Sequence, residues 1–234
     1  MAYLYEHIRT QGFEPMHFEE HYAHLDALAR KLFVRPLNVE REELKRQIAE
    51  TLRKEGFSAH TMNAVCVRCY SDGSLNVEGV EMLYNQFSLR AIRPNGYICR
   101  VSGELLVANT SAKDALTELN GEISQLSEEG VSIWVNEQGE VLAIDGSPVI
   151  AVFEDEIRFS RMCEGVEFDV AYATIGDIRR KITKEEIRVE QLCDVKELLC
   201  VDYRGVTALE SFESHRYVDI IAERIAMKVA DAER

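Results

Sequence analysis

The sequence predicts an α+β protein with two domains, a small N-terminal α+β domain over residues 1–108 and a larger C-terminal α+β domain over residues 109–234. The composition supports a folded chain, because 46% of the residues are hydrophobic and 29% are charged. Segments with the two-residue alternation of strands and segments with helical periodicity occur in both halves. Between residues 108 and 113 a strand-rich stretch gives way to a long helical segment, which places the domain boundary there.

The N-terminal domain is predicted to combine two helices with strands. Residues 2–10 alternate as a strand, and the turn "GFEP" leads into an amphipathic helix over residues 17–34. A second helix is expected after Asn38, whose side chain can cap the acidic first turn "VEREEL". Strands are predicted near residues 62–70, 80–92 and 97–107, with "SDGS" as a turn.

The C-terminal domain is predicted to begin with a helix. Ser111 can cap this helix, Asp114 lies in its first turn, and Gly130 marks its end. The apolar positions of the last helix lie on one face, as expected for packing against a core. The other predicted elements are the hairpin "VSIWVNEQGEVLAI", the strand "PVIAVF", a helix around 166–180, the strand "EEIRV", a short helix around 191–196, the strand "ELLCVDY" and the final helix over 215–231.

The charge balance narrows the partners of the chain. Forty-one acidic residues against 27 basic ones give a formal charge of −14 and a pI near 4.9. Such a surface is unsuited to neutralising phosphate backbones, so we expect no nucleic-acid partner. The start "MAYLYEHIRTQG" lacks the pattern of a signal peptide, and "GSPVIAVF" is far shorter than the roughly 20 apolar residues that span a bilayer. We therefore expect a cytoplasmic protein with no membrane partner.

The six cysteines are expected to be reduced, because they are scattered along a chain with no export signal. Cys66 and Cys69 form a C-x-x-C pair, which can indicate a redox or zinc site. However, "NAVCVRCYS" alternates like a strand, where residues three apart point to opposite faces. Structural thiols are therefore the favoured interpretation.

Three of the six histidines lie close together, at His17, His21 and His24. On a helix, positions i, i+4 and i+7 form one stripe, which is one arrangement that could ligate a metal. The segment "HFEEH" lacks the glutamate of the H-E-x-x-H zinc motif, and His17 lies where the chain is still turning into the helix. Solvated or capping histidines are favoured, and we predict no metal site.

The sequence segment that contains these histidines resembles that of a known protein family. The stretch "YEHIRTQGFEPMHFEEHYAHLDALARKL" resembles the opening of the class IV aminotransferases, the fold-type IV pyridoxal phosphate (PLP) enzymes. This family includes branched-chain and D-amino-acid aminotransferases and aminodeoxychorismate lyase. The residues that match in register are Tyr5, Glu6, Ile8, Arg9, Gly12, Pro15, Glu20, His21 and Leu25.

The resemblance implies a fold, a cofactor and an assembly. It implies a small N-terminal α/β domain followed by a larger mixed-sheet, barrel-like domain, with PLP as the cofactor and a homodimer as the assembly. His24 stands where the family has the arginine that grips the phosphate of the cofactor, and Tyr5 would line the substrate side of the pocket.

A Schiff-base lysine and a carboxylate are the next features that the resemblance implies. Lys113 is the only lysine between Lys54 and Lys181 and lies near the domain junction, as the catalytic lysine should. An exposed lysine in a first helical turn is the alternative. The family places a glutamate about thirty residues later, to keep the pyridine nitrogen protonated. Asp145 lies at 145 − 113 = 32 residues, whereas an ungapped alignment puts Ala143 there instead.

The phosphate loop of the family, L-x-G-I-T-R at the start of a helix, corresponds best to "MCEGVEFDV". Gly165 and Val166 fit this loop. Glu167 replaces the threonine and Phe168 the arginine, so two expected phosphate contacts are altered.

The segment "ELLCVDYRGVTAL" resembles the late strand and loop of the lyase branch. Arg204 and Thr207 lie on the part that lines the substrate and phosphate side of the site. Arg204 is fork-shaped and always charged, so it suits a carboxylate or a phosphate, although a surface arginine is the alternative.

Two functions follow from the resemblance. The first is a PLP-dependent aminotransferase or aminodeoxychorismate-lyase-like enzyme acting on a small amino acid or amino-substituted carboxylate. The second is a non-catalytic relative that has lost PLP binding and serves as a binding or regulatory protein, an interpretation that the changes at His24 and Glu167 favour.

Overall fold

The computed structural model describes residues 1–82, 86–91, 93–102, 108–126, 130–161, 164–176 and 180–233. The chain forms two compact units. The first unit holds residues 1–86 and 108–111, and the second holds residues 87–107 and 112–234. The segment 87–107 therefore belongs with the C-terminal part of the chain, although the sequence placed it in the N-terminal domain.

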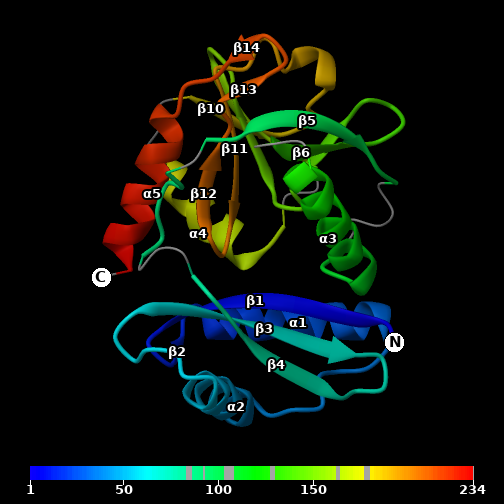
Figure 1. The fold of residues 1–234 in the computed structure, drawn as a ribbon, viewed down its shortest axis with the longest axis vertical. Coiled ribbons are helices and arrows are strands. Elements are labelled where there is room, and N and C mark those ends of the chain that lie inside the picture. The colour runs from blue at the N-terminus through cyan, green and yellow to red at the C-terminus, as the bar shows by residue number, and fades with distance from the viewer. Residues whose placement is uncertain are drawn as a thin grey trace. The chain divides into compact units, whose positions relative to one another are not determined.

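The first unit is one antiparallel sheet with two helices (Figure 1). Helix α1 packs on β1 and helix α2 packs on β4. In α1 the buried positions Leu25, Leu28 and Ala29 follow the three- and four-residue spacing that a helix needs to cover a sheet. The strand order is β2-β1-β3-β4, with β1 at Tyr3–Gln11, β2 at Glu14–Pro15, α1 at Phe18–Leu32, α2 at Arg41–Lys54, β3 at Met62–Tyr70 and β4 at Leu75–Val80.

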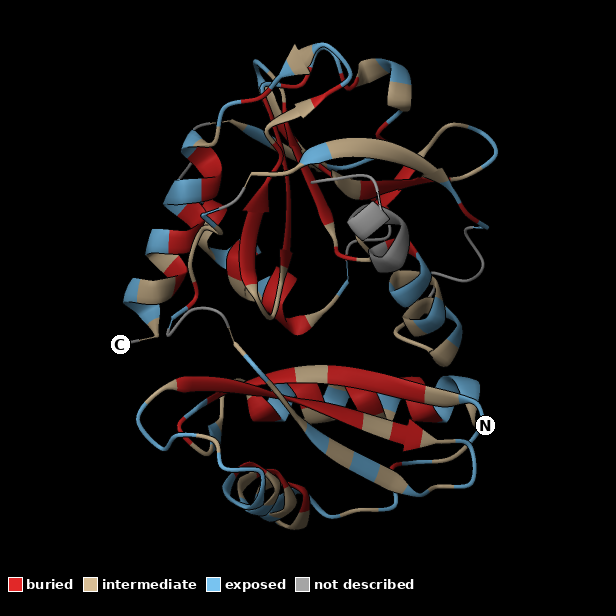
Figure 2. Ribbon diagram, viewed as in Figure 1, coloured by how far each residue is buried: buried red, intermediate tan, exposed pale blue. Residues whose placement is uncertain are grey.

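Burial differs between the central and the edge strands of this sheet (Figure 2). Strands β1 and β3 are buried at nearly every position, whereas the edge strand β4 alternates between exposed and partly buried residues. The strand predicted at 80–92 is wrong, because the hairpin closes earlier and pairs Cys69 with Leu75. The predicted cap Asn38 is also wrong, since Glu40 occupies the N-cap of α2 and its side chain makes no capping bond.

The second unit contains two five-stranded sheets (Figure 1). One sheet has the order β10-β9-β8-β11-β12 and the other has the order β14-β13-β5-β6-β7. The strands of the first are β8 at Val149–Val152, β9 at Glu156–Phe159, β10 at Lys181–Lys184, β11 at Glu197–Asp202 and β12 at Gly205–Ala208. The strands of the second are β5 at Asn95–Arg100, β6 at Gly130–Val135, β7 at Val141–Ile144, β13 at Ser211–Phe212 and β14 at His215–Arg216.

The described part of this unit also holds four helical elements. They are α3 at Ser111–Leu126, α4 at Val166–Ile175, the 3-10 helix η2 at Val189–Gln191 and α5 at Ile220–Ala232. Helices α4 and α5 pack on each other, and they contact β11 and β12. None of the described helices is long and apolar enough to cross a membrane.

The core of the second unit is layered, and β8 shows how. Val149 and Ala151 belong to the cluster shared with the other sheet, whereas Ile150 and Val152 belong to the cluster that includes α4 and α5. Successive strand residues point to opposite faces, so both faces of this strand are buried and its sequence "VIAV" is apolar throughout. This explains why the segment reads as a continuous apolar run.

The outer face of the other sheet carries a smaller cluster beneath α3. Trp134 of β6 is fully buried and packs with Leu142, Ala143 and Val101, while Leu116 of α3 is partly buried against them. The indole Nε1 of Trp134 donates to Ser132 Oγ at 2.7 Å. The packing of Leu116 places α3 against this cluster.

Several predicted elements shift in the structure. The strand predicted at "EEIRV" is wrong, because β10 ends at Lys184, and the helix predicted at 191–196 is replaced by η2 and a turn. The last helix begins at Ile220 and not at residue 215, because β14 occupies the start of that span. Strand β9 was not predicted. Parts of the predicted strand 97–107 and of the predicted helix ends near residues 130 and 180 lie outside the described residues.

Candidate functional site

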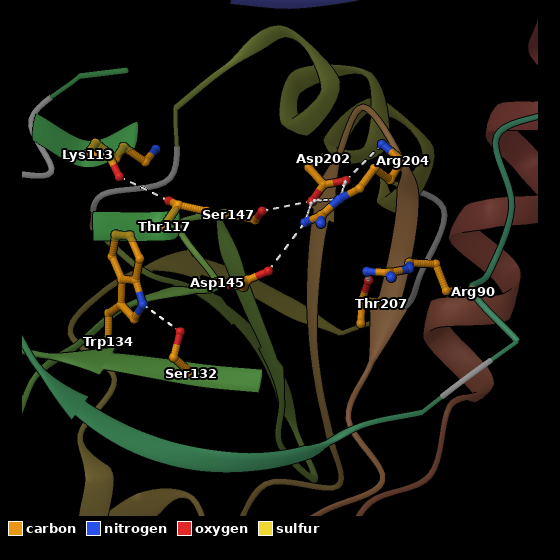
Figure 3. A network of polar contacts seen from close by, with 10 residues as sticks. All are labelled: Arg90, Lys113, Thr117, Ser132, Trp134, Asp145, Ser147, Asp202, Arg204 and Thr207. Atoms are coloured by element: carbon orange, nitrogen blue, oxygen red, sulfur yellow. Dashed lines mark hydrogen bonds and ion pairs between the residues drawn. The ribbon is translucent and has the colours of Figure 1, made fainter. Parts of the chain in front are cut away.

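Lys113 lies in the first turn of α3 and is partly buried. Its carbonyl oxygen accepts a hydrogen bond from Thr117 Oγ1 at 3.0 Å, one helical turn later (Figure 3). The packing of Leu116 on Trp134 holds this end of the helix against β6. Lys113 is therefore carried by an anchored helical turn.

Asp145 and Gly146 form the two-residue turn between β7 and β8. Both have positive φ, at 49° and 75°, and the flanking Ile144 and Ser147 exchange backbone hydrogen bonds of 3.0 and 2.8 Å. Two consecutive residues at positive φ are typical of a type I′ turn, for which Asp-Gly is a preferred sequence. At this turn the chain passes from one sheet of the unit to the other.

The turn packs directly against the start of α3. A Cβ added to Gly146 would lie 3.1 Å from Thr117 Oγ1, 3.3 Å from Trp134 Cη2 and 3.4 Å from Lys113 Cε. Glycine is needed for this close approach as well as for the turn. The structure thus brings Lys113 next to the turn that carries Asp145, as Figure 3 shows.

The hairpin between β11 and β12 supplies the guanidinium. Asp202 pairs with Gly205, and Tyr203 and Arg204 form the loop between them. Gly205 has φ 116°, and a Cβ there would lie 2.3 Å from the carbonyl oxygen of Ser88, so no other residue fits without moving that backbone.

Asp202 and Arg204 form a closely bonded pair. Arg204 Nε and Nη2 donate to the two carboxylate oxygens of Asp202 at distances from 2.5 to 3.2 Å, and the Arg204 amide donates to Oδ1 at 2.8 Å. Ser147 Oγ donates to Asp202 Oδ2 at 2.9 Å, and Arg204 Nη2 also lies 3.6 Å from Asp145 Oδ2. One guanidinium thus faces two carboxylates (Figure 3).

The electrostatics of the pair follow from this geometry. Burial alone would raise the pKa of Asp202, but the charge and hydrogen bonds of Arg204 outweigh it and lower that pKa. The charge of Asp202 in turn raises the pKa of Arg204. The negative charge of Asp202 is therefore largely compensated by the guanidinium of Arg204.

Thr207 lies on β12 and its side chain is buried. Its hydroxyl accepts a hydrogen bond from Arg90 Nη1 at 3.3 Å (Figure 3). Arg90 reaches this position because Ser88 and Arg90 form backbone hydrogen bonds with Val206, which attaches their segment to β12.

The predicted phosphate loop lies at the start of α4. Gly165 occupies the N-cap position with φ 128°, and Val166 begins the helix. A helix N-terminus favours anions through its amides and its dipole. Glu167, however, is buried within this first turn, and Phe168 packs edge-on against Phe159 in the core with ring centroids 5.2 Å apart. Phe168 is therefore a core residue.

The other two predicted site residues belong to the first unit. Tyr5 is buried on β1, and its ring lies 5.4 Å from the ring of His7. His24 Nδ1 lies 3.1 Å from Glu6 Oε2, and His21 Nδ1 lies 3.0 Å from Glu6 Oε1. Burial would raise the pKa of Glu6, but the two histidines lower it to about 2. The histidine stripe is thus organised by a buried carboxylate.

The remaining metal and thiol candidates have structural positions. His17 sits at the N-cap of α1 in the left-handed region with φ 47°. Within the described ranges, no group of three or more His, Cys, Asp or Glu side chains is arranged to hold a metal ion. Cys66 and Cys69 are buried on β3 as thiols outside any disulfide, and Cys163 lies outside the described residues.

The structure therefore brings together part of the predicted set. Arg204 contacts Asp145 and Asp202, Lys113 lies next to the Asp145–Gly146 turn, and Thr207 lies on the adjoining strand β12 (Figure 3). Ala143, the alternative to Asp145, is buried in the apolar cluster beneath α3.

Sequence reasoning missed four residues that make the polar contacts described above, namely Arg90, Thr117, Ser147 and Asp202. Asp202 could have been found, because an aspartate two residues before Arg204 in a tight turn is suited to bond the Arg204 amide. Arg90 could not, because only the pairing of its segment with β12 places it there.

Comparison with known proteins bears on the fold. No family model and no curated protein sequence matches the chain. Among solved structures, a branched-chain aminotransferase from Thermoproteus uzoniensis with norvaline superposes with a TM-score of 0.80 at 15% identity, covering 97% of this chain and 84% of that one. A protein assigned as a 4-amino-4-deoxychorismate lyase from Legionella pneumophila gives 0.79 at 10% identity, covering 98% and 90%.

A third similar structure is the PLP-bound form of a hypothetical aminotransferase from Mycobacterium tuberculosis. It superposes with a TM-score of 0.74 at 14% identity and covers 99% of this chain and 90% of that one. These similarities extend over nearly the whole chain. The sequence identities are so low that they support a shared backbone fold and nothing further. The predicted fold class is confirmed: the chain has the fold of the fold-type IV aminotransferases and aminodeoxychorismate lyase.

Proposed function

We propose that this chain is a PLP-dependent enzyme acting on a small amino acid or amino-substituted carboxylate, as an aminotransferase or an aminodeoxychorismate-lyase-like enzyme. The observation that carries the proposal is the packing of the Asp145–Gly146 turn on the first turns of α3. Because of this packing, a Cβ added to Gly146 would lie only 3.4 Å from Lys113 Cε. The turn that carries Asp145 thus lies beside the aliphatic stem of Lys113, and a primary amine and a carboxylate are the two groups that a pyridoxal ring requires.

The residues at the ring end fit the cofactor. Lys113 supplies the amine, and Asp145 supplies a carboxylate for the pyridine nitrogen. The side chain of Asp145 is partly exposed, so it is open to a partner other than Arg204. When bound, PLP would serve as the electron sink that makes the Cα–H bond of an amino acid acidic.

Fewer groups are suited to binding the phosphate of the cofactor. The first amides of α4 after Gly165 suit a phosphate, and Arg204 provides a guanidinium. Glu167 and Asp202 add negative charge to the same unit. We therefore expect PLP to be held mainly by Lys113 and the ring contacts, and more weakly by its phosphate.

Lys113 would have two tasks in the reaction. Its Nζ would bond the cofactor covalently and, once displaced by the amine of the substrate, take the Cα proton and return it to a neighbouring carbon. The position of Lys113 in an anchored helical turn suits proton transfer between two fixed points. Arg204 and Thr207 would bind the substrate carboxylate or the phosphate.

A second candidate function rests on a specific observation. Asp202 occupies two donor nitrogens of Arg204, and Glu167 is buried in the first turn of α4. Both features disfavour a phosphate dianion. They support a non-catalytic relative that keeps the fold and serves as a binding or regulatory protein.

One spectroscopic experiment separates the two candidates. Purified protein is incubated with PLP, dialysed and scanned in the visible range, with Lys113→Ala beside it and Lys181→Ala as a control for an exposed lysine. We expect a retained absorption band in wild type and Lys181→Ala that is missing in Lys113→Ala. Borohydride reduction and peptide mass spectrometry should then place a pyridoxyl group on Lys113.

The outcomes differ clearly. A band fixed to Lys113 supports the enzyme and justifies a screen of amino donors and aminodeoxychorismate. Wild type that dialyses colourless refutes the enzyme and favours the non-catalytic relative. We further propose a homodimer, for which light scattering should give twice the 26.7 kDa of one chain.

A further inference from the structure

We propose that Asp202 acts as an internal anion that holds Arg204 and makes this site discriminate against phosphorylated ligands in favour of the same ligands without the phosphate. The inference rests on the proposed function, because it concerns which form of the cofactor the site accepts. It assigns a role to a residue that the resemblance to the aminotransferases does not mark.

The first argument is the geometry of the pair. An arginine binds an anion best through two parallel N–H donors. Arg204 Nε and Nη2 form such a pair of donors, and both bond the carboxylate of Asp202, at 3.0 Å and 2.5 Å to Oδ2. A phosphate could bind these two donors of Arg204 only by displacing the carboxylate of Asp202.

The second argument is that Asp202 is anchored by more than Arg204. The hydroxyl of Ser147 and the backbone amide of Arg204 both donate to it, at 2.9 and 2.8 Å. Its side chain is only 13% exposed, so little water would compensate for a lost bond. Displacement therefore costs several hydrogen bonds at once.

The third argument is the local charge. Arg204 lies between Asp202 and Asp145, whose oxygens are 2.5 and 3.6 Å from its Nη2. The three side chains carry a net negative charge, so a dianion that approaches Arg204 meets repulsion and no net attraction. A ligand of the same shape without the phosphate escapes this penalty.

The test compares PLP with 5-deoxypyridoxal, which has the same ring and aldehyde but no phosphate. Trp134 is the only tryptophan, and its ring lies beside Gly146, so quenching of its fluorescence reports ligands at this site. The variants are Asp202→Asn, which keeps the shape and an oxygen for Ser147, and Asp202→Ser as a second way to remove the charge. The control is Asp194→Asn, an exposed aspartate that precedes the opposite end of β11.

We expect wild type to bind 5-deoxypyridoxal at least as tightly as PLP, because the phosphate dianion meets net negative charge around Arg204. Asp202→Asn should tighten PLP by about tenfold or more and leave 5-deoxypyridoxal within about twofold, because only the dianion feels the removed charge. Asp194→Asn should change neither. Unchanged PLP binding in folded Asp202→Asn and Asp202→Ser overturns the inference. A wild type that binds PLP more than about tenfold tighter than 5-deoxypyridoxal also overturns it, even if neither variant folds.

Inorganic phosphate separates this result from a failure of the proposed function. If neither aldehyde forms an adduct with Lys113, the proposed enzyme is refuted, but phosphate binding can still be followed by Trp134 fluorescence. Asp202→Asn that then binds phosphate about tenfold tighter than wild type supports the internal anion, and equal binding overturns it.

Discussion

The buried carboxylate of Glu6 is held ionised by two histidines. Its pKa is lowered from 4.5 to about 2 in the folded chain, although burial alone would raise it. A carboxylate whose pKa falls on folding contributes stability above its unfolded pKa, and this contribution is lost as the pH falls through the folded value. The window here runs from about pH 4.5 down to about pH 2.

We therefore predict that acid destabilises wild type more steeply than Glu6→Gln. The difference in the pH-dependent free energy of unfolding should be roughly 3 kcal/mol across this window, on the scale of 1.36 kcal/mol per pKa unit. Denaturant titrations from about pH 6 down to about pH 2 would measure it, with the exposed Glu14→Gln as control. Parallel pH profiles for wild type and Glu6→Gln would contradict the assignment.

Gly146 is required for two reasons, its positive φ and its close packing on neighbouring side chains. A matched pair of variants can distinguish the two. Gly146 has φ 75°, and an added Cβ would press on Thr117, Trp134 and Lys113. Gly56 has a similar φ of 85°, but a Cβ there would meet nothing within 4 Å. Alanine should cost roughly 1 kcal/mol at either position through backbone strain.

We predict that Gly146→Ala also weakens PLP binding by at least about tenfold, because moving Lys113 by a fraction of an ångström disturbs its geometry. Gly56→Ala should leave binding unchanged. Absorbance titration with PLP and urea unfolding of both variants measure the two effects. Equal binding by Gly146→Ala and wild type would show that the turn does not position the lysine.

At this scale the sequence predicted the residues with a motif and missed those without one. The family resemblance pointed to Lys113 and Asp145, and the structure places the Asp145–Gly146 turn beside Lys113, while their roles stay a prediction. Asp202 was missed because its importance comes from bonds to Arg204 and Ser147 that appear only when two hairpins approach. Spacing cannot predict such contacts between elements.

Helix α5 begins on a buried carboxylate from a neighbouring strand. Glu197, the first residue of β11, accepts hydrogen bonds from the amides of Ile221 at 2.8 and 2.9 Å and of Ala222 at 3.1 Å. The first amides of a helix have no partner within the helix, so a carboxylate there satisfies them and complements the dipole. Burial is the main reason that the pKa of Glu197 is raised.

We predict that Glu197→Ala lowers the free energy of unfolding by roughly 2–4 kcal/mol, since it leaves two buried amides without an acceptor. Glu223→Ala, in the first turn of the same helix but exposed, should cost less than about 0.5 kcal/mol. Equilibrium denaturation followed by circular dichroism would measure both. A Glu197→Ala variant as stable as Glu223→Ala would show that water replaces the cap.

Elements were predicted well where burial gives a clear period and poorly where it does not. Strands β1 and β3 and helix α1 are strongly patterned and lie close to their predicted positions. The edge strand β4 contains "LNVEGV", whose polar residues resemble a loop, so the apolar residues after it were taken for the strand. The start of α5 was misplaced because Glu197, which caps it, is remote in sequence.

The fold as a whole tolerates change in its polar residues. Identities of 10–15% to the aminotransferase and lyase structures accompany TM-scores of 0.79–0.80. The buried apolar positions of β8 fill both core clusters of the second unit. Apolar patterning determines the fold, while a few polar side chains determine the chemistry, so the two can diverge.

Ligand binding to the second unit should be visible in the stability of the molecule. A ligand that binds only the folded state at a hundred times its Kd stabilises it by about 2.7 kcal/mol. For a chain of this length that corresponds to a rise in Tm of roughly 5–10 °C. We predict such a rise with saturating PLP in wild type, a larger one in Asp202→Asn, and none in Lys113→Ala.

Differential scanning calorimetry at several PLP concentrations measures this shift. Because Lys113 belongs to the second unit, a transition that the first unit makes separately should not move with PLP. Inorganic phosphate at the same concentration controls for the general effect of a multivalent anion. If Tm stays constant while PLP rises through the millimolar range, the fold no longer binds the cofactor, and the non-catalytic relative becomes the better account of this chain.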